Sequence, residues 1–156
     1  MDNQDNHHHE LSLVRTINAS PDKVFRAWTE PELLMQWFTP KPWTVASAEL
    51  DVRPGGTQLV VMRSPEGREF PNRGVYLDVV KNERIVFTDA YTSAWVPSEK
   101  AFFTAVITFE DDAGKTKYTA RVLHWNEADR LTHENMGFHQ GWSMATDQLE
   151  ELVARL

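Results

Sequence analysis

The chain has 156 residues, a length that predicts one domain with room for a sizeable core. Its 16 Lys and Arg residues against 23 Asp and Glu residues give a formal net charge of -7, which argues against general nucleic-acid binding and against electrostatic docking on anionic lipid. The absence of cysteine excludes disulfides, thiolate nucleophiles and cysteine-bearing metal sites.

The N-terminus is polar, and we expect residues 1–9 to form a disordered tail before a single domain over residues 10–156. The tail contains His7-His8-His9, which is either native or the remnant of a tag. Apolar and polar residues are then interleaved from Leu11 to Ile17, and this pattern predicts a first strand.

Two short helices are expected next, each opened by a dipeptide that contains proline. Ser20-Pro21 opens the first, because serine accepts bonds from the free N–H groups of the first turn and proline loses nothing at the first helical position. Glu30-Pro31 repeats the signal, and Pro40 ends the second helix. The apolar residues of the two helices are Val24, Phe25, Trp28, Leu33, Leu34 and Trp37.

The hydrophobic period changes to two between Trp43 and Trp125. Short turns such as Pro54-Gly55-Gly56 separate the segments, and connections this short force neighbouring strands to be antiparallel. The longest connection, Thr92 to Lys100, is expected to be a flexible loop over the mouth of a cavity. Strands are predicted over residues 44–52, 57–64, 70–80, 84–92, 101–110 and 116–125.

Helical spacing returns after the last strand, with a short helix predicted near residues 127–135 and a long one near residues 139–155. Gly137 and Gly141 lie one turn apart, which indicates a kink or a close approach to backbone or ligand. A curved antiparallel sheet with the long helix across its inner face would bury every apolar stripe, an α+β two-layer architecture. A curved sheet cannot contact a straight helix along its whole length, so a cavity between them is expected.

Strand alternation also predicts which side chains face inward. On the last strand, the more apolar set is Tyr118, Ala120, Val122 and His124, so His124 should point toward the interior. On the strand before it we expect an inward Phe103 face that continues through Ala105, Ile107 and Phe109, with Phe102 on the opposite face.

Several segments together resemble a known family. They are the segment from Ala19 to Phe38, then Arg53-Pro54-Gly55-Gly56, Gly74-Val75-Tyr76 and Gly141-Trp142. Their order and spacing are similar to the SRPBCC/START-like superfamily, in the branch related to the C-terminal domain of the activator of heat-shock protein ninety ATPase. The resemblance implies a helix-grip fold, in which about seven strands wrap around the C-terminal helix and enclose an apolar cavity. Members carry lipids, act as polyketide cyclases or aromatases, or modulate chaperones.

The first functional hypothesis is a protein that binds a small apolar or aromatic molecule, with His124 or Tyr76 as its polar anchor. The second is an enzyme of cyclase, aromatase or hydrolase type that uses acid–base groups in the same cavity. The third is a regulator of a chaperone ATPase, which needs a protein-binding surface. The candidate cavity-lining residues are Trp37, Phe38, Met62, Tyr76, Phe87, Phe103, His124, Phe138, Gly141 and Trp142.

A metal site is conceivable if the fold gathers His124, His133, Glu134 and His139. The spacing of these residues fits no known ligand signature, so neither a metal nor a cofactor is expected. No apolar run approaches the length of a membrane span, and the polar N-terminus is unlike a signal peptide. We therefore expect a cytoplasmic monomer or homodimer that binds neither nucleic acid nor membrane.

Overall fold

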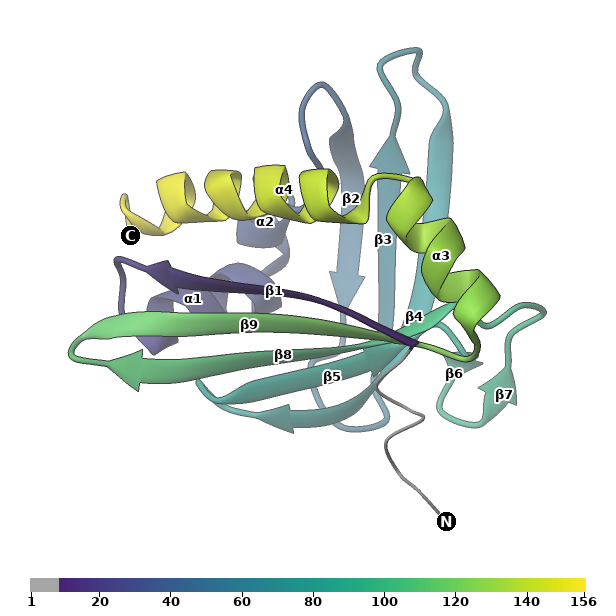
Figure 1. Cartoon of the computed structure of the whole chain (residues 1–156), viewed down its shortest axis with the longest axis horizontal. Coiled ribbons are helices and arrows are strands. Elements are labelled where there is room, and N and C mark those ends of the chain that lie inside the picture. Colours follow the sequence, from purple (N-terminus) through teal and green to yellow (C-terminus); the bar gives the residue numbers. More distant parts are fainter. Residues whose placement is uncertain (1–8) are drawn as a thin grey trace.

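The structure, a computed structural model, describes residues 9–156 (Figure 1). Apart from His9, the expected N-terminal tail lies outside the described residues. In chain order the elements are β1 (Glu10–Ile17), α1 (Pro21–Thr29), α2 (Pro31–Leu34), β2 (Thr44–Leu50), β3 (Thr57–Arg63), β4 (Glu69–Val80), β5 (Arg84–Thr88), β6 (Tyr91–Ser93), β7 (Val96–Pro97), β8 (Phe103–Asp112), β9 (Lys115–His124), α3 (Glu127–Asn135) and α4 (Phe138–Val153).

The α+β prediction is confirmed. Seven strands form one sheet in the order β1-β9-β8-β5-β4-β3-β2, and every neighbouring pair is antiparallel. The first strand lies beside the last, with Glu10 opposite Leu123 and Ile17 opposite Thr116. The chain ends in α4, which Figure 1 shows as one long helix that follows the shorter α3.

The apolar stripe of α4 completes the core. Its buried apolar residues pack in one cluster with side chains of α1, α2 and the strands. Arg15 of β1 fixes the helix from the side, because its guanidinium donates to Ser143 Oγ at 2.8 Å, to Glu150 at 3.3 Å and to Asp147. The helix therefore has one face in the core and a polar attachment to the edge strand.

The predicted inward faces are confirmed on β9 and on its neighbour β8. Tyr118, Ala120, Val122 and His124 are all buried, whereas Trp125 beyond the strand end is exposed. On β8 the residues Ala105, Ile107 and Phe109 are buried, and Phe103 is half-buried against the core. His124 thus lies on the inner face, at the end of β9 that leads into α3.

Three local expectations were wrong. The Ser20 hydroxyl donates to the Asp22 carboxylate and makes no capping hydrogen bond with the first turn of α1. The strand expected over residues 84–92 ends at Thr88, and the expected loop Thr92 to Lys100 contains a small hairpin of β6 and β7. Asp89 ends the strand pairing, because its carboxylate accepts hydrogen bonds from the backbone N–H groups of Phe102 and Phe103.

The two glycines near the start of α4 have different roles. Gly137 precedes the helix with φ 98°, in the left-handed region, and it turns the chain between α3 and α4. A Cβ atom added at Gly141 would meet, among the described residues, just Pro40 Cγ at 4.0 Å, an ordinary contact. The kink is therefore at Gly137, and the close approach expected at Gly141 does not occur.

This difference predicts that replacement of glycine by alanine has opposite effects on stability at the two positions. Gly141→Ala should stabilise the protein by up to about 1 kcal/mol, because alanine is the better residue inside a helix. Gly137→Ala should destabilise it by about 1 kcal/mol or more, because an L side chain is strained at positive φ. Urea unfolding of both variants measures the two signs. Destabilisation by Gly141→Ala would mean that α4 lies closer to its neighbours than described.

Candidate functional site

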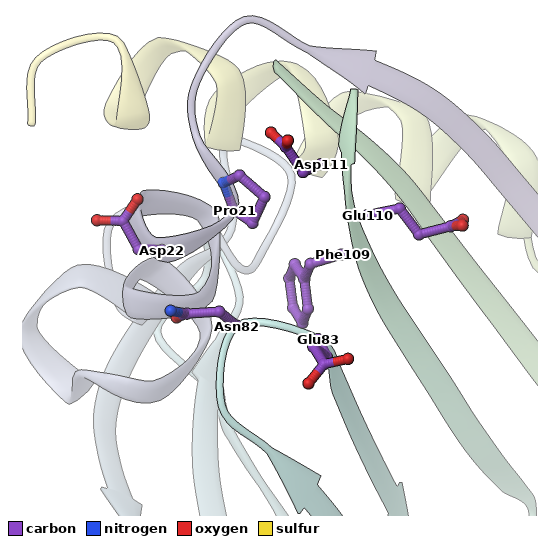
Figure 2. Close-up of a pocket in the computed structure, with 7 residues that line it drawn as sticks. All are labelled: Pro21, Asp22, Asn82, Glu83, Phe109, Glu110 and Asp111. Carbon is purple, nitrogen blue, oxygen red and sulfur yellow. The ribbon is translucent and has the colours of Figure 1, made fainter. Parts of the chain in front are cut away.

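A surface hollow of about 530 Å³ lies where α1 begins beside the β4–β5 turn and β8. Figure 2 shows its acidic side chains pointing in different directions and not toward a common centre. Phe109, its one aromatic residue, is 2% exposed, so the hollow offers an apolar ligand little surface. Its lining residues are Pro21, Asp22, Asn82, Glu83, Phe109, Glu110 and Asp111.

A different group of side chains gathers where β8, β9, α3 and α4 meet, and we call it the His–aromatic cluster. His133 of α3 lies at its centre, with ring centroids 5.1 Å from Phe102, 5.6 Å from Phe103 and 5.1 Å from Phe138. Phe138 is buried, whereas Phe102, Phe103 and His133 are half-buried. The cluster consists of Phe102, Phe103, His124, His133, Phe138 and Trp142.

Local sequence signals bring these elements together. β9 ends at His124, and the Asn126 side chain caps α3 by accepting the backbone N–H of Asp129 at 2.8 Å. The helix returns over the strand end, which places His133 beside His124. The left-handed turn at Gly137 then starts α4, whose first residue, Phe138, packs on His133.

The two histidines form a hydrogen-bonded pair. His124 Nδ1 lies 2.8 Å from the backbone oxygen of His9, and His124 Nε2 lies 2.8 Å from His133 Nδ1. A carbonyl oxygen can only accept, so His124 Nδ1 carries a hydrogen. No described residue makes a hydrogen bond to His133 Nε2. Burial, together with the charge of His124 when protonated, lowers the pKa of His133 to about 4, so His133 is neutral at neutral pH.

Glu134 and His139 form a second side-chain pair beside the two histidines. Their side chains meet at 3.1 Å, and Arg130 binds Glu134 at 3.3 Å and Glu127 at 2.8 Å. The fold thus gathers the four residues considered as metal ligands, but as two pairs whose polar atoms bind each other. Among residues 9–156, no group of three or more His, Asp or Glu side chains is arranged to hold a metal ion.

The candidate lining residues divide between two regions. Phe103, His124, Phe138 and Trp142 belong to the His–aromatic cluster, and Phe103 continues toward Phe87 at 6.3 Å. The others lie elsewhere in or against the core. They are Trp37, Phe38 and Phe87 around Trp28, Tyr76 beside Gln58, Met62 on β3 and Gly141 near Pro40.

Tyr76, one of the two expected polar anchors, is 1% exposed. Its hydroxyl accepts a hydrogen bond from Gln58 Nε2 at 3.4 Å, and burial raises the pKa of Tyr76 to about 12. It is a neutral core residue at the β3–β4 pair. His124, the other expected anchor, has both ring nitrogens occupied, so the nitrogen left for a ligand belongs to His133.

Two residues of the cluster were not in the expected lining. Phe102 was assigned to the outer face, but β8 begins at Phe103, so strand alternation does not apply to it. Its ring lies instead against His124 and His133. From the sequence, His133 is a candidate metal ligand and nothing more. An aromatic pair beside an inward histidine, Phe102-Phe103 opposite His124, is the sequence signal that could have indicated the cluster.

Comparison with known structures supports the fold. Protein NE0264 from Nitrosomonas europaea is 39% identical, with a TM-score of 0.92, and the match covers 99% of this chain and 97% of that one. Protein Ms6760 from Mycobacterium smegmatis is 21% identical, with a TM-score of 0.79 and coverages of 97% and 95%, and supports the fold alone. An AHSA1-like protein from Aeromonas hydrophila is 16% identical, with a TM-score of 0.73 and coverages of 94% and 92%.

The family of the chain follows from a sequence profile. No curated protein matches the chain. None of the helices in the described part of the chain has the length and apolar character needed to cross a membrane. The sequence profile described as Activator of Hsp90 ATPase homolog 1-like protein matches residues 18–154, nearly the whole chain. The protein therefore belongs to the Activator of Hsp90 ATPase homolog 1-like family.

Proposed function

We propose that the protein binds a small, mainly apolar or aromatic molecule at the His–aromatic cluster, with His133 as the polar anchor. The observation that carries this proposal is a neutral histidine, with one ring nitrogen left without a described partner, set among three phenylalanine rings. Binding sites for small molecules typically combine an apolar wall with few polar groups.

The burial of the cluster supports binding more than simple core packing. Phe102, Phe103, His133 and Trp142 each keep part of their surface accessible, whereas Phe138 beneath them is 2% exposed. A hollow of about 260 Å³ reaches the cluster at one member, His124, and its other lining residues are His9, Thr104, Leu123 and Trp125. An apolar molecule placed against the aromatic rings of the cluster would remove their accessible surface from water, at roughly 25 cal/mol per Å².

A neutral fluorescent probe tests the proposal. The wild-type protein should bind 1-N-phenylnaphthylamine saturably, with an increase in probe fluorescence. Trp142→Ala should weaken binding by about tenfold, since an aromatic contact in a binding site is worth on the order of 1.4 kcal/mol. Fluorescence titration measures both, and circular dichroism establishes that the variant is folded.

Trp95→Ala is the matched control. Trp95 lies on the β6–β7 hairpin and is 83% exposed, so its removal changes the same residue type away from the cluster. Equal weakening by the two substitutions would contradict the proposed site. Absence of any saturable binding would contradict the proposed function and leave surface binding, which the chaperone role in the family description requires, as the function to test.

A second candidate is an enzyme that uses His133 as a general base. His133 Nε2 offers the accepting nitrogen that a general base needs, since no residue within 9–156 bonds to it, but a pKa of about 4 makes the imidazole a weak base at neutral pH. Mass spectrometry of a bound molecule before and after incubation distinguishes the two functions. An unchanged molecule supports a binding protein, and a converted one supports an enzyme.

A further inference from the structure

We propose that His133 Nε2 is held as a hydrogen-bond acceptor, and that the ligands of the His–aromatic cluster are therefore neutral molecules that donate an O–H or N–H group, phenols above all. This inference rests on the proposed function and names the chemical class that the same site selects.

The backbone carbonyl of His9 determines which ring nitrogens of His124 and His133 carry a hydrogen. Its oxygen accepts from His124 Nδ1 at 2.8 Å, so the hydrogen of neutral His124 is on Nδ1 and its Nε2 carries a lone pair. His133 Nδ1 lies 2.8 Å from that lone pair and must donate to it. The hydrogen of neutral His133 is therefore on Nδ1, which leaves Nε2 with a lone pair.

The opposite arrangement would lose one of these bonds. A hydrogen on His133 Nε2 would set the Nδ1 lone pair of His133 against the Nε2 lone pair of His124. Moving the His124 hydrogen to Nε2 would then set its Nδ1 lone pair against the His9 carbonyl oxygen. His124 is 7% exposed, so water is poorly placed to repair either contact.

The charged groups near His133 favour a neutral ligand over an anion. Arg130 and Glu134, on either side of His133 in α3, bind each other, and Arg130 also binds Glu127. Glu134 binds His139 on its other side. The guanidinium of Arg130 is thus already matched by carboxylates, and a ligand carboxylate would add a negative charge beside Glu134.

The ring contacts favour an aromatic donor. Phe102, Phe103 and Phe138 surround His133 at 5.1 to 5.6 Å between ring centroids. A phenol can place its ring against these aromatic side chains while its hydroxyl reaches a neighbouring acceptor. A ketone or an ether of the same size offers His133 Nε2 no hydrogen, so it would leave that lone pair unpaired.

Two ligands of nearly equal shape test the inference. At neutral pH, 2-naphthol should bind the wild-type protein about tenfold or more tightly than 2-methoxynaphthalene, because the ether lacks the donor. In His133→Phe, which keeps an aromatic ring, the two should bind equally. Quenching of tryptophan fluorescence measures all four affinities.

The outcomes separate the inference from the proposed function. Equal binding of both compounds to the wild-type protein, or the same preference in His133→Phe, would overturn the inference while the binding function stands. Binding of neither compound would contradict the proposed function itself.

Nitrogen-15 NMR of the wild-type histidines gives a readout that needs neither ligand nor variant. An unprotonated Nε2 at His133 is expected, and a hydrogen on that atom would overturn the inference.

Discussion

Trp28→Ala is expected to lower the free energy of unfolding by about 3–5 kcal/mol, the range for removing a large aromatic residue from a core. Trp28 is 1% exposed and has ring centroids 5.1 Å from Trp37, 5.7 Å from Phe38 and 5.8 Å from Phe87. Its indole N–H donates to the hydroxyl of Tyr118, which is itself fully buried. The substitution therefore leaves both a cavity and a polar group without its donor.

Collapse of the neighbours should not fill this cavity. Trp37 is held by its own hydrogen bond to the Ala27 carbonyl at 2.9 Å, and Phe87 is fixed by its place in the sheet. Urea unfolding measures the loss, with Trp95→Ala as the control on the exposed hairpin, for which a change within about 0.5 kcal/mol is expected. A loss below about 1 kcal/mol for Trp28→Ala would show that α1 is not packed on the sheet as described.

The sheet could be predicted best at strands such as β8 and β9, in which one face is buried. On β9, the alternation from Tyr118 to His124 has one side in the core and the other at least partly open, so the period of two survives in the sequence. The β6–β7 hairpin could not be predicted in this way. Its strands are short and largely exposed, so no alternation marks them, and the Asp89 contacts that end β5 join residues thirteen and fourteen positions apart.

The candidate site was predicted in part. Strand parity indicated that His124 points inward, and helical spacing put Phe138 and Trp142 on one face of α4. His133 could not be found from periodicity, because no residue of α3 is fully buried. Its pairing with His124 depends on the angle at which α3 leaves β9, and tertiary packing sets that angle.

A sequence does not distinguish aromatic side chains that line a cavity from those that fill the core. Tyr76, Phe87 and Phe138 were expected on inner faces and lie there, but each is at most 6% exposed and fills space between elements. Phe103 and Trp142 have the same chemistry and remain half-buried. The difference comes from how closely the sheet and helices approach at each position, which a hydrophobic pattern does not contain.

The stability of the protein should fall as pH is lowered through the titration of His133. The pKa of His133 is about 4 in the folded protein against 6.5 as the ordinary value, because burial and His124 disfavour its charge. Between these pH values the unfolded chain binds a proton that the folded protein does not, so stability is full above pH 6.5 and is lost on the way down to about pH 4.

The shift corresponds to an upper value of roughly 3.4 kcal/mol, and we expect about 1–2 kcal/mol because His133 is only half-buried and solvent screens its charge. Carboxylates also titrate toward acid pH, so the quantity to measure is the difference between wild type and His133→Gln. Glutamine has no proton to gain, and its amide can still donate to His124 Nε2. Urea unfolding at a series of pH values should show the wild type losing stability relative to the variant across this window. Parallel curves for the two proteins would mean that His133 is solvated in the fold, and that the phenylalanine rings around it do not exclude water from the imidazole.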